Sequence, residues 1–129
     1  MRKTVQTPNA PAAIGPYSQA IVYGGLVFTS GQIPLDPQTG CVVGDNIRDQ
    51  AEQVMKNLTA VLEAAGSSPQ NAVKTTCFLA DMADFAVFNE VYAACFTTNP
   101  ARSCVAVKTL PKGVLVEVEV VAGMNPNEI

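Results

Sequence analysis

One arginine stands where it could bind a carboxylate. Arg102 follows the rigid Pro100 and opens a run of residues typical of a strand. The planar guanidinium of arginine matches a carboxylate through two parallel hydrogen bonds. A single arginine also fits an ordinary surface salt bridge, and composition alone favours that alternative. Cys104 follows two residues later on the same strand face, where packing or a weak hydrogen bond is a better expectation than nucleophilic attack.

A carboxylate stands in the middle of a valine-rich run. Glu117 and Glu119 alternate with valines near the end of the chain. Removing a carboxylate from water is unfavourable unless the group is paired, exposed or used in chemistry. We expect Glu119 to be exposed. Glu117 is a candidate for acid or base chemistry, with exposure on an open sheet face as the alternative.

Three further places could supply polar groups to a site. Tyr17 follows a Gly-Pro pair that would fix its hydroxyl, although such tyrosines commonly pack the ring and bond the hydroxyl to the backbone. Ser30 and Gly31 end an expected strand, where a hydroxyl and an amide could hold a small anion or simply lead into a loop. Asn89 lies between the apolar stripe of an expected helix and solvent.

The composition excludes several classes of function. The 129 residues contain no histidine, which rules out Ser-His-Asp and Cys-His catalysis, histidine metal sites and imidazole acid–base chemistry. A net charge of −3 argues against a nucleic-acid partner. The four cysteines stand singly, so we expect free thiols and no metal site. No apolar run approaches the roughly 20 residues of a membrane span, and no signal segment is evident, so we expect a cytoplasmic protein that does not bind membranes.

Two amphipathic helices are the clearest elements. The first is expected from about residue 46 to 65, with Asp45 or Asn46 as its N-cap and Gly66 at its end. Its apolar residues recur at helical spacing, at Ile47, Ala51, Val54, Leu58, Val61, Leu62 and Ala65. The opposite face is expected to be solvated and carries Arg48, Gln50, Glu52, Lys56 and Glu63. The second helix is expected from residue 84 to about 96, with Phe85, Phe88, Tyr92 and Cys95 on its apolar stripe.

Short strands make up most of the remainder. We expect strands at residues 20–23, 26–30, 72–79, 103–107 and 114–122, with a tight hairpin turn at Gly24-Gly25. A short helical turn is expected at Ser68-Pro69. The tail after Gly123 is expected to fray.

These elements describe one α+β domain over residues 1–129. We expect a mixed sheet of about six strands with both helices on one face. Valines of the last strand would face the helices. The opposite face mixes two glutamates with apolar residues and stays uncovered, so we expect self-association.

Five motifs follow one another over nearly the whole chain: AAIGPYSQA at 12–20, FTSGQIP at 28–34, DFAVFNEVY at 84–92, PARSCV at 100–105 and LPKGVLVEVE at 110–119. In this order and spacing they resemble the Rid/YjgF family of reactive-intermediate deaminases. The resemblance implies a chorismate-mutase-like fold and a homotrimer with clefts between subunits. It also implies hydrolysis of 2-imino acids and their enamine tautomers, such as 2-aminoacrylate, 2-iminopropanoate and 2-iminobutanoate, to 2-keto acids and ammonia without a cofactor.

The resemblance also implies roles for residues of this chain. Arg102 would hold the substrate carboxylate, Glu117 would position the attacking water, and Tyr17 would belong to the catalytic group. Substrate-binding positions would be Ser30, Gly31, Asn89 and Cys104. One departure is the short segment 97–99, where many relatives carry a longer loop, and this difference leaves the pocket shape and the substrate range open.

Two other functions stay open. A non-enzymatic trimer could bind 2-keto acids or other small carboxylates through the same arginine. RNA cleavage or inhibition of translation is attributed to some relatives, but the acidic charge and the missing histidine weigh against it.

Overall fold

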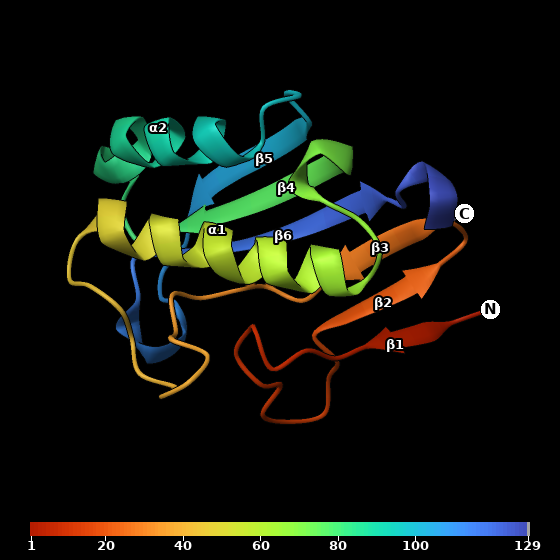
Figure 1. The fold of residues 1–129 in the computed structure, drawn as a ribbon. Coiled ribbons are helices and arrows are strands. Elements are labelled where there is room, and N and C mark those ends of the chain that lie inside the picture. The colour runs from red at the N-terminus through yellow and green to blue at the C-terminus, as the bar shows by residue number, and fades with distance from the viewer. Residues whose placement is uncertain (129) are drawn as a thin grey trace.

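A six-stranded mixed sheet carries both helices on one face (Figure 1). The computed structural model describes residues 1–128. The strand order is β1-β2-β3-β6-β4-β5, and all neighbours are antiparallel except β4 and β5. The main elements are β1 (Lys3–Val5), β2 (Ala20–Tyr23), β3 (Leu26–Thr29), α1 (Ile47–Ala64), β4 (Ala72–Leu79), α2 (Phe85–Cys95), β5 (Ala101–Ala106) and β6 (Val116–Gly123). This confirms the expected class, a mixed sheet with two helices.

Local sequence signals account for the limits of α1. The Asn46 side chain accepts a hydrogen bond from the Asp49 amide, so Asn46 is the N-cap. At the other end Gly66 adopts a positive φ of 86°. The Gly66 amide donates to the Glu63 carbonyl and the Ser67 amide to the Leu62 carbonyl. These are the two hydrogen bonds of a Schellman motif. The helix therefore begins and ends where the cap residues predict.

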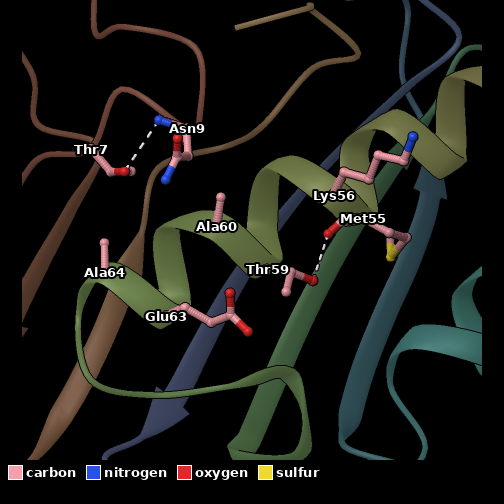
Figure 2. Close-up of a pocket in the computed structure, with 8 residues that line it drawn as sticks. All are labelled: Thr7, Asn9, Met55, Lys56, Thr59, Ala60, Glu63 and Ala64. Carbon is pink, nitrogen blue, oxygen red and sulfur yellow. Dashed lines mark hydrogen bonds between the residues drawn. The ribbon is translucent and has the colours of Figure 1, made fainter.

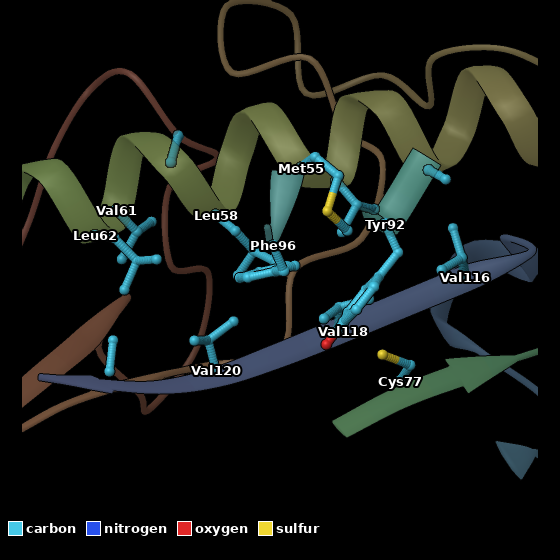
Figure 3. Packing of buried hydrophobic residues seen from close by; sticks show 14 of the residues in the cluster. Met55, Leu58, Val61, Leu62, Cys77, Tyr92, Phe96, Val116, Val118 and Val120 are labelled. Carbon is cyan, nitrogen blue, oxygen red and sulfur yellow. The ribbon is translucent and has the colours of Figure 1, made fainter. Parts of the chain in front are cut away.

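The core lies between the helices and the sheet. Val116, Val118 and Val120 of β6 are at most 2% exposed and meet apolar residues of α1 such as Leu58 and Leu62 (Figure 3). Full burial of one such side chain stabilises the fold by about 1.5–3 kcal/mol. The alternation of β6 predicted from sequence is thereby confirmed.

The open sheet face remains partly apolar. Phe28 and Val105 are 41% and 47% exposed on this face, which also carries Glu117 and Glu119. Neither helix within residues 1–128 has the length and apolarity needed to cross a bilayer.

Three expectations need correction. The strand β1 pairs with β2 and was not predicted, because three residues are too few to show an alternating pattern. Gln50 is buried, since its side chain donates to the Gly44 carbonyl and accepts from the Leu115 amide. The tail is held in place: the Asn125 amide donates to the Gly66 carbonyl, and the Asn71 side chain donates to that of Asn125 at 2.7 Å.

Short turns and 3-10 helices complete this framework. The turn predicted at Ser68-Pro69 is a 3-10 helix at Pro69–Asn71. Both hairpin glycines, Gly24 and Gly25, have the positive φ that a tight turn between twisted strands requires. Further 3-10 turns lie at Met82–Asp84, Pro111–Gly113 and Pro126–Glu128.

Candidate functional site

Helix α2 builds a cradle for the Arg102 side chain. Phe85, Asn89 and Tyr92 lie four and three residues apart, so they share one face of the helix. The Arg102 Nη1 atom donates to Asn89 Oδ1 at 2.8 Å. The guanidinium carbon lies 5.4 Å from the ring centroid of Phe85 and 4.8 Å from that of Tyr92, within cation–π range. The guanidinium is thus fixed by one hydrogen bond and two aromatic rings.

Arg102 has no carboxylate partner within residues 1–128, where the single ion pair joins Arg48 and Glu90 on the surface. Within residues 1–128, Arg102 therefore does not form the surface salt bridge that composition favoured for it. A guanidinium has five N–H donors, and the contact with Asn89 uses only one donor nitrogen. The remaining donors can bind an external carboxylate.

Cys104 lies beside Arg102 on the helix-facing side of β5. It pairs in register with Cys77 of β4, and both thiols are free. Burial raises the pKa of the Cys104 thiol, partly offset by the positive charge of Arg102. A thiol with a raised pKa is mostly protonated near neutrality, so it is a poor nucleophile.

Glu117 lies on the other face of the sheet, against Gly31. A Cβ atom built on Gly31 would overlap the Glu117 carboxylate, so the glycine leaves room for the carboxylate in this position. Burial raises the pKa of the Glu117 carboxyl, and the charge of Glu119 raises it further. A carboxyl with a raised pKa is a stronger base when ionised, which suits proton transfer.

Glu117 and Gly31 line a cavity of about 590 Å³. Its wall is largely apolar and includes Ile14, Ile33 and Leu35. An apolar wall with a few polar groups is typical of a small-molecule site.

Tyr17 and Ser30 belong to the same cavity. The Tyr17 ring is 53% exposed, and its hydroxyl accepts a long 3.4 Å hydrogen bond from the Ile14 amide rather than donating to a carbonyl. The Ser30 hydroxyl donates to the Ser18 carbonyl at 2.6 Å. Ser30 therefore ties the tyrosine loop to the end of β3.

Sequence reasoning missed the residue that shapes this loop. Gln19 is 3% exposed, and its side chain accepts from the Thr7 amide and donates to the carbonyls of Thr7, Ala10 and Pro11. A buried glutamine in a loop gives no periodic signal. Phe85 and Tyr92 were predicted only as helix stripe residues, although their spacing from Asn89 could have indicated a shared face.

The predicted residues form two groups on opposite faces of the sheet. We call Asn89, Arg102 and Cys104 the arginine half-site, and Tyr17, Ser30, Gly31 and Glu117 the glutamate half-site. Arg102 contacts α2 on the helix-covered face, whereas Glu117 alternates with the buried valines of β6 and faces away from the helices. Within one chain, the sheet therefore separates Arg102 from Glu117.

Another hollow lies along the outer side of α1 (Figure 2). It measures about 470 Å³ and is lined by residues that include Thr7, Lys56 and Glu63. None of the predicted site residues lines it. No cluster of three Cys, Asp or Glu side chains suited to a metal ion occurs in residues 1–128.

Comparison with known proteins identifies the family. A family model described as endoribonuclease L-PSP matches residues 7–124. A RutC family protein of Synechocystis is 55% identical over 123 residues, covering 93% of this chain and 95% of that protein. The 2-iminobutanoate/2-iminopropanoate deaminase of Salmonella typhimurium is 52% identical over 126 residues, covering 95% and 98%.

Solved structures agree with this assignment. The crystal structure of Escherichia coli TdcF with bound serine superposes with a TM-score of 0.91 at 46% identity, covering 95% of this chain and 99% of that one. The motifs, the fold and these matches lead to one conclusion: the chain belongs to the endoribonuclease L-PSP family, also called the Rid/YjgF family.

Proposed function

We propose that this protein hydrolyses 2-imino acids and their enamine tautomers to 2-keto acids and ammonia, at sites between the subunits of a homotrimer. The observation that carries the proposal is the Arg102 guanidinium, which is held in a fixed orientation without a carboxylate partner in residues 1–128. Relatives at 51–52% identity that are named 2-iminobutanoate/2-iminopropanoate deaminase support it.

The separation of the two half-sites supports a site shared between copies. A substrate that contacts both Arg102 and Glu117 must lie between two chains, because one sheet holds these residues on opposite faces. The partly apolar open face offers a surface for such contact, with Phe28 and Val105 exposed on it. Closed rings of identical subunits provide this head-to-tail arrangement.

The proposed reaction needs little more than positioning. Arg102 binds the substrate carboxylate and thereby places the imine carbon in front of a water molecule. Glu117 accepts a proton from that water as its oxygen bonds to the carbon of the protonated imine and the C=N π electrons move to nitrogen, which gives a neutral carbinolamine. Glu117 then returns the proton to nitrogen, the carbon–nitrogen bond breaks as the hydroxyl loses its proton to form the carbonyl, and the products are the 2-keto acid and ammonia. The overall reaction adds one water and needs no cofactor.

The other predicted residues complete the pocket. Tyr17, which is about half exposed, offers its hydroxyl to the reacting groups, and Ser30 keeps the tyrosine loop in place. Gly31 gives the Glu117 carboxylate room, and Asn89 fixes the arginine. Cys104 contributes packing beside Arg102.

A mixing experiment tests the shared site. Arg102→Ala and Glu117→Ala are each expected to keep a tenth or less of wild-type activity, which is measured as ammonia release from imine generated by a serine or threonine dehydratase. When equal amounts are mixed under conditions of subunit exchange, about a quarter of the sites regain both residues, because each site takes one residue from each of two chains. Recovery of about a quarter of wild-type activity is expected. Wild-type activity in unmixed Arg102→Ala trimers would overturn the proposed function.

A second candidate is a binding protein without catalysis. The bound serine in TdcF favours it, because serine presents a carboxylate next to nitrogen. In that case 2-oxobutanoate binds in calorimetry and Arg102→Ala abolishes binding, while imine hydrolysis does not exceed the uncatalysed rate. The family description names an endoribonuclease, but a net charge of −3 does not favour RNA binding.

A further inference from the structure

Tyr92 connects Arg102 to a buried hydroxyl on the neighbouring strand. The face of its ring lies 4.8 Å from the guanidinium carbon of Arg102. At the far end of the ring, its hydroxyl lies 2.7 Å from the Thr75 hydroxyl. Thr75 stands opposite Arg102 in the parallel pairing of β4 with β5. The three residues thus form a closed arrangement joining β4, β5 and α2.

The hydroxyl pair is buried and holds the ring at a defined depth. Thr75 is fully buried and Tyr92 is 8% exposed. Figure 3 shows Tyr92 reaching from α2 towards the sheet. A buried phenol must find a hydrogen-bond partner, and Thr75 is the partner the structure provides. The ring therefore cannot withdraw from the sheet without leaving two buried hydroxyls unpaired.

The fixed position of the Tyr92 ring matters for the Arg102 guanidinium, which lies over it. Asn89 fixes one of its nitrogens, but a single hydrogen bond leaves the guanidinium plane free to tilt. The rings of Tyr92 and Phe85 define that plane, because cation–π attraction depends on where the cation lies over the ring. Two-point recognition of a carboxylate requires a fixed plane.

We propose that Tyr92, held by its hydroxyl bond to Thr75, is a positioning residue that sets the orientation of the Arg102 guanidinium. The catalytic consequence rests on the proposed function, since Arg102 is the group assigned to the substrate carboxylate. Thr75 acts through Tyr92 and touches no substrate.

The first measurement observes Arg102 directly. The chain has three arginines, so three side-chain Nε–H signals are expected in a ¹⁵N-correlated NMR spectrum, and Arg102→Lys assigns the one of interest. The two rings should shift this signal away from that of the exposed Arg2. Thr75→Val preserves shape and removes the partner hydroxyl, so the Arg102 signal is expected to move towards that of Arg2.

Controls separate this effect from a loss of stability. Thr75→Val combined with Tyr92→Phe removes both hydroxyls and leaves none unpaired, so this variant is expected to fold if the single variant does not. The same movement of the signal is expected in it. Leu79→Val destabilises the same strand about 13 Å farther along, and is expected to leave the signal in place.

The second measurement is kinetic. Thr75→Val is expected to raise KM about three- to tenfold and to change kcat less than twofold, because the arginine binds substrate in both the ground and transition states. In an Arg102→Ala background the same substitution is expected to add no further loss. The Kd for 2-oxobutanoate is expected to rise by a similar factor to KM.

Two results would overturn the inference: an unmoved Arg102 signal in both hydroxyl variants, or an undiminished effect of Thr75→Val in the Arg102→Ala background. Failure of the proposed function looks different. Wild-type protein would then hydrolyse no imine, while the NMR signal would still show whether Thr75 and Tyr92 orient Arg102.

Discussion

The two half-sites hold their charged groups in opposite ways. In the arginine half-site, Arg102 is stabilised by Asn89 and two aromatic rings. In the glutamate half-site, Glu117 lies against Gly31 in a largely apolar cavity, and its pKa is raised by burial and by Glu119. The surroundings of Arg102 stabilise its positive charge, whereas the burial of Glu117 disfavours its negative charge.

This difference matches the tasks proposed for the two groups. A residue that binds a carboxylate gains from a rigid orientation, because little freedom is then lost on binding. A residue that takes a proton gains from a raised pKa near the working pH. The rigid packing of Arg102 therefore suits substrate binding, and the unfavourable burial of Glu117 suits proton transfer. Separate substitutions can remove each of them.

The largest effect is expected from removing the base. Glu117→Gln should lower kcat about 10²- to 10⁴-fold with little change in KM, because the amide cannot accept the proton. The fall in kcat is measured as ammonia release from dehydratase-generated imine. Glu119→Gln, on the same sheet face, serves as the control and should keep kcat within about threefold. Wild-type kcat in Glu117→Gln would remove the distinction between the half-sites.

Removing the anchor should have the next largest effect. Arg102→Ala loses charge-assisted hydrogen bonds of about 1.5–3 kcal/mol each, so kcat/KM is expected to fall roughly 10- to 100-fold. Arg102→Lys should restore little, since an ammonium lacks the planar pair of donors. Arg48→Ala breaks only the surface pair with Glu90 and should behave like wild type. Light scattering should show the same assembly for these variants as for wild type.

A smaller effect is expected from crowding the carboxylate. Gly31→Ala places a methyl group against the Glu117 side chain and should lower kcat several-fold while changing thermal stability little, because the carboxylate end can move. Gly123→Ala is a matched control, since a Cβ there meets only the Asn71 carbonyl at ordinary contact distance. Equal kcat in the two variants would show that the position of the carboxylate is unimportant.

The smallest effect concerns the coupling of the half-sites across copies. If Arg102 of one chain lies near Glu117 of the next, its positive charge lowers the pKa of that carboxyl in the trimer. Arg102→Ala should then raise the Glu117 pKa, which a ¹³C NMR titration of the side-chain carboxyl measures. Glu63→Gln, on the exposed side of α1, should leave it unchanged. An unchanged pKa in Arg102→Ala would argue against the shared site.

Much of the fold could be predicted because its signals are local. Asn46 and Gly66 mark the limits of α1, and alternating valines define the buried face of β6. The exceptions depend on distant partners. Gln50 has a polar side chain at a position that looks solvated, but the Leu115 amide, 65 residues away, makes its burial favourable.

The candidate site also combines features that are visible in the sequence with features that depend on distant parts of the chain. The sequence by itself determined which groups are candidates for the chemistry, because an arginine after proline, a glutamate among valines and the absence of histidine are visible without coordinates. Only the tertiary structure decided how these groups relate. Helix packing and the pairing of β5 with β4 turn Arg102 towards Tyr92 and Asn89, on the face opposite Glu117. The alternation of β6 places Glu117 opposite the buried valines, but the face that Arg102 takes depends on contacts of β5 with β4 and α2, which lie elsewhere in the chain.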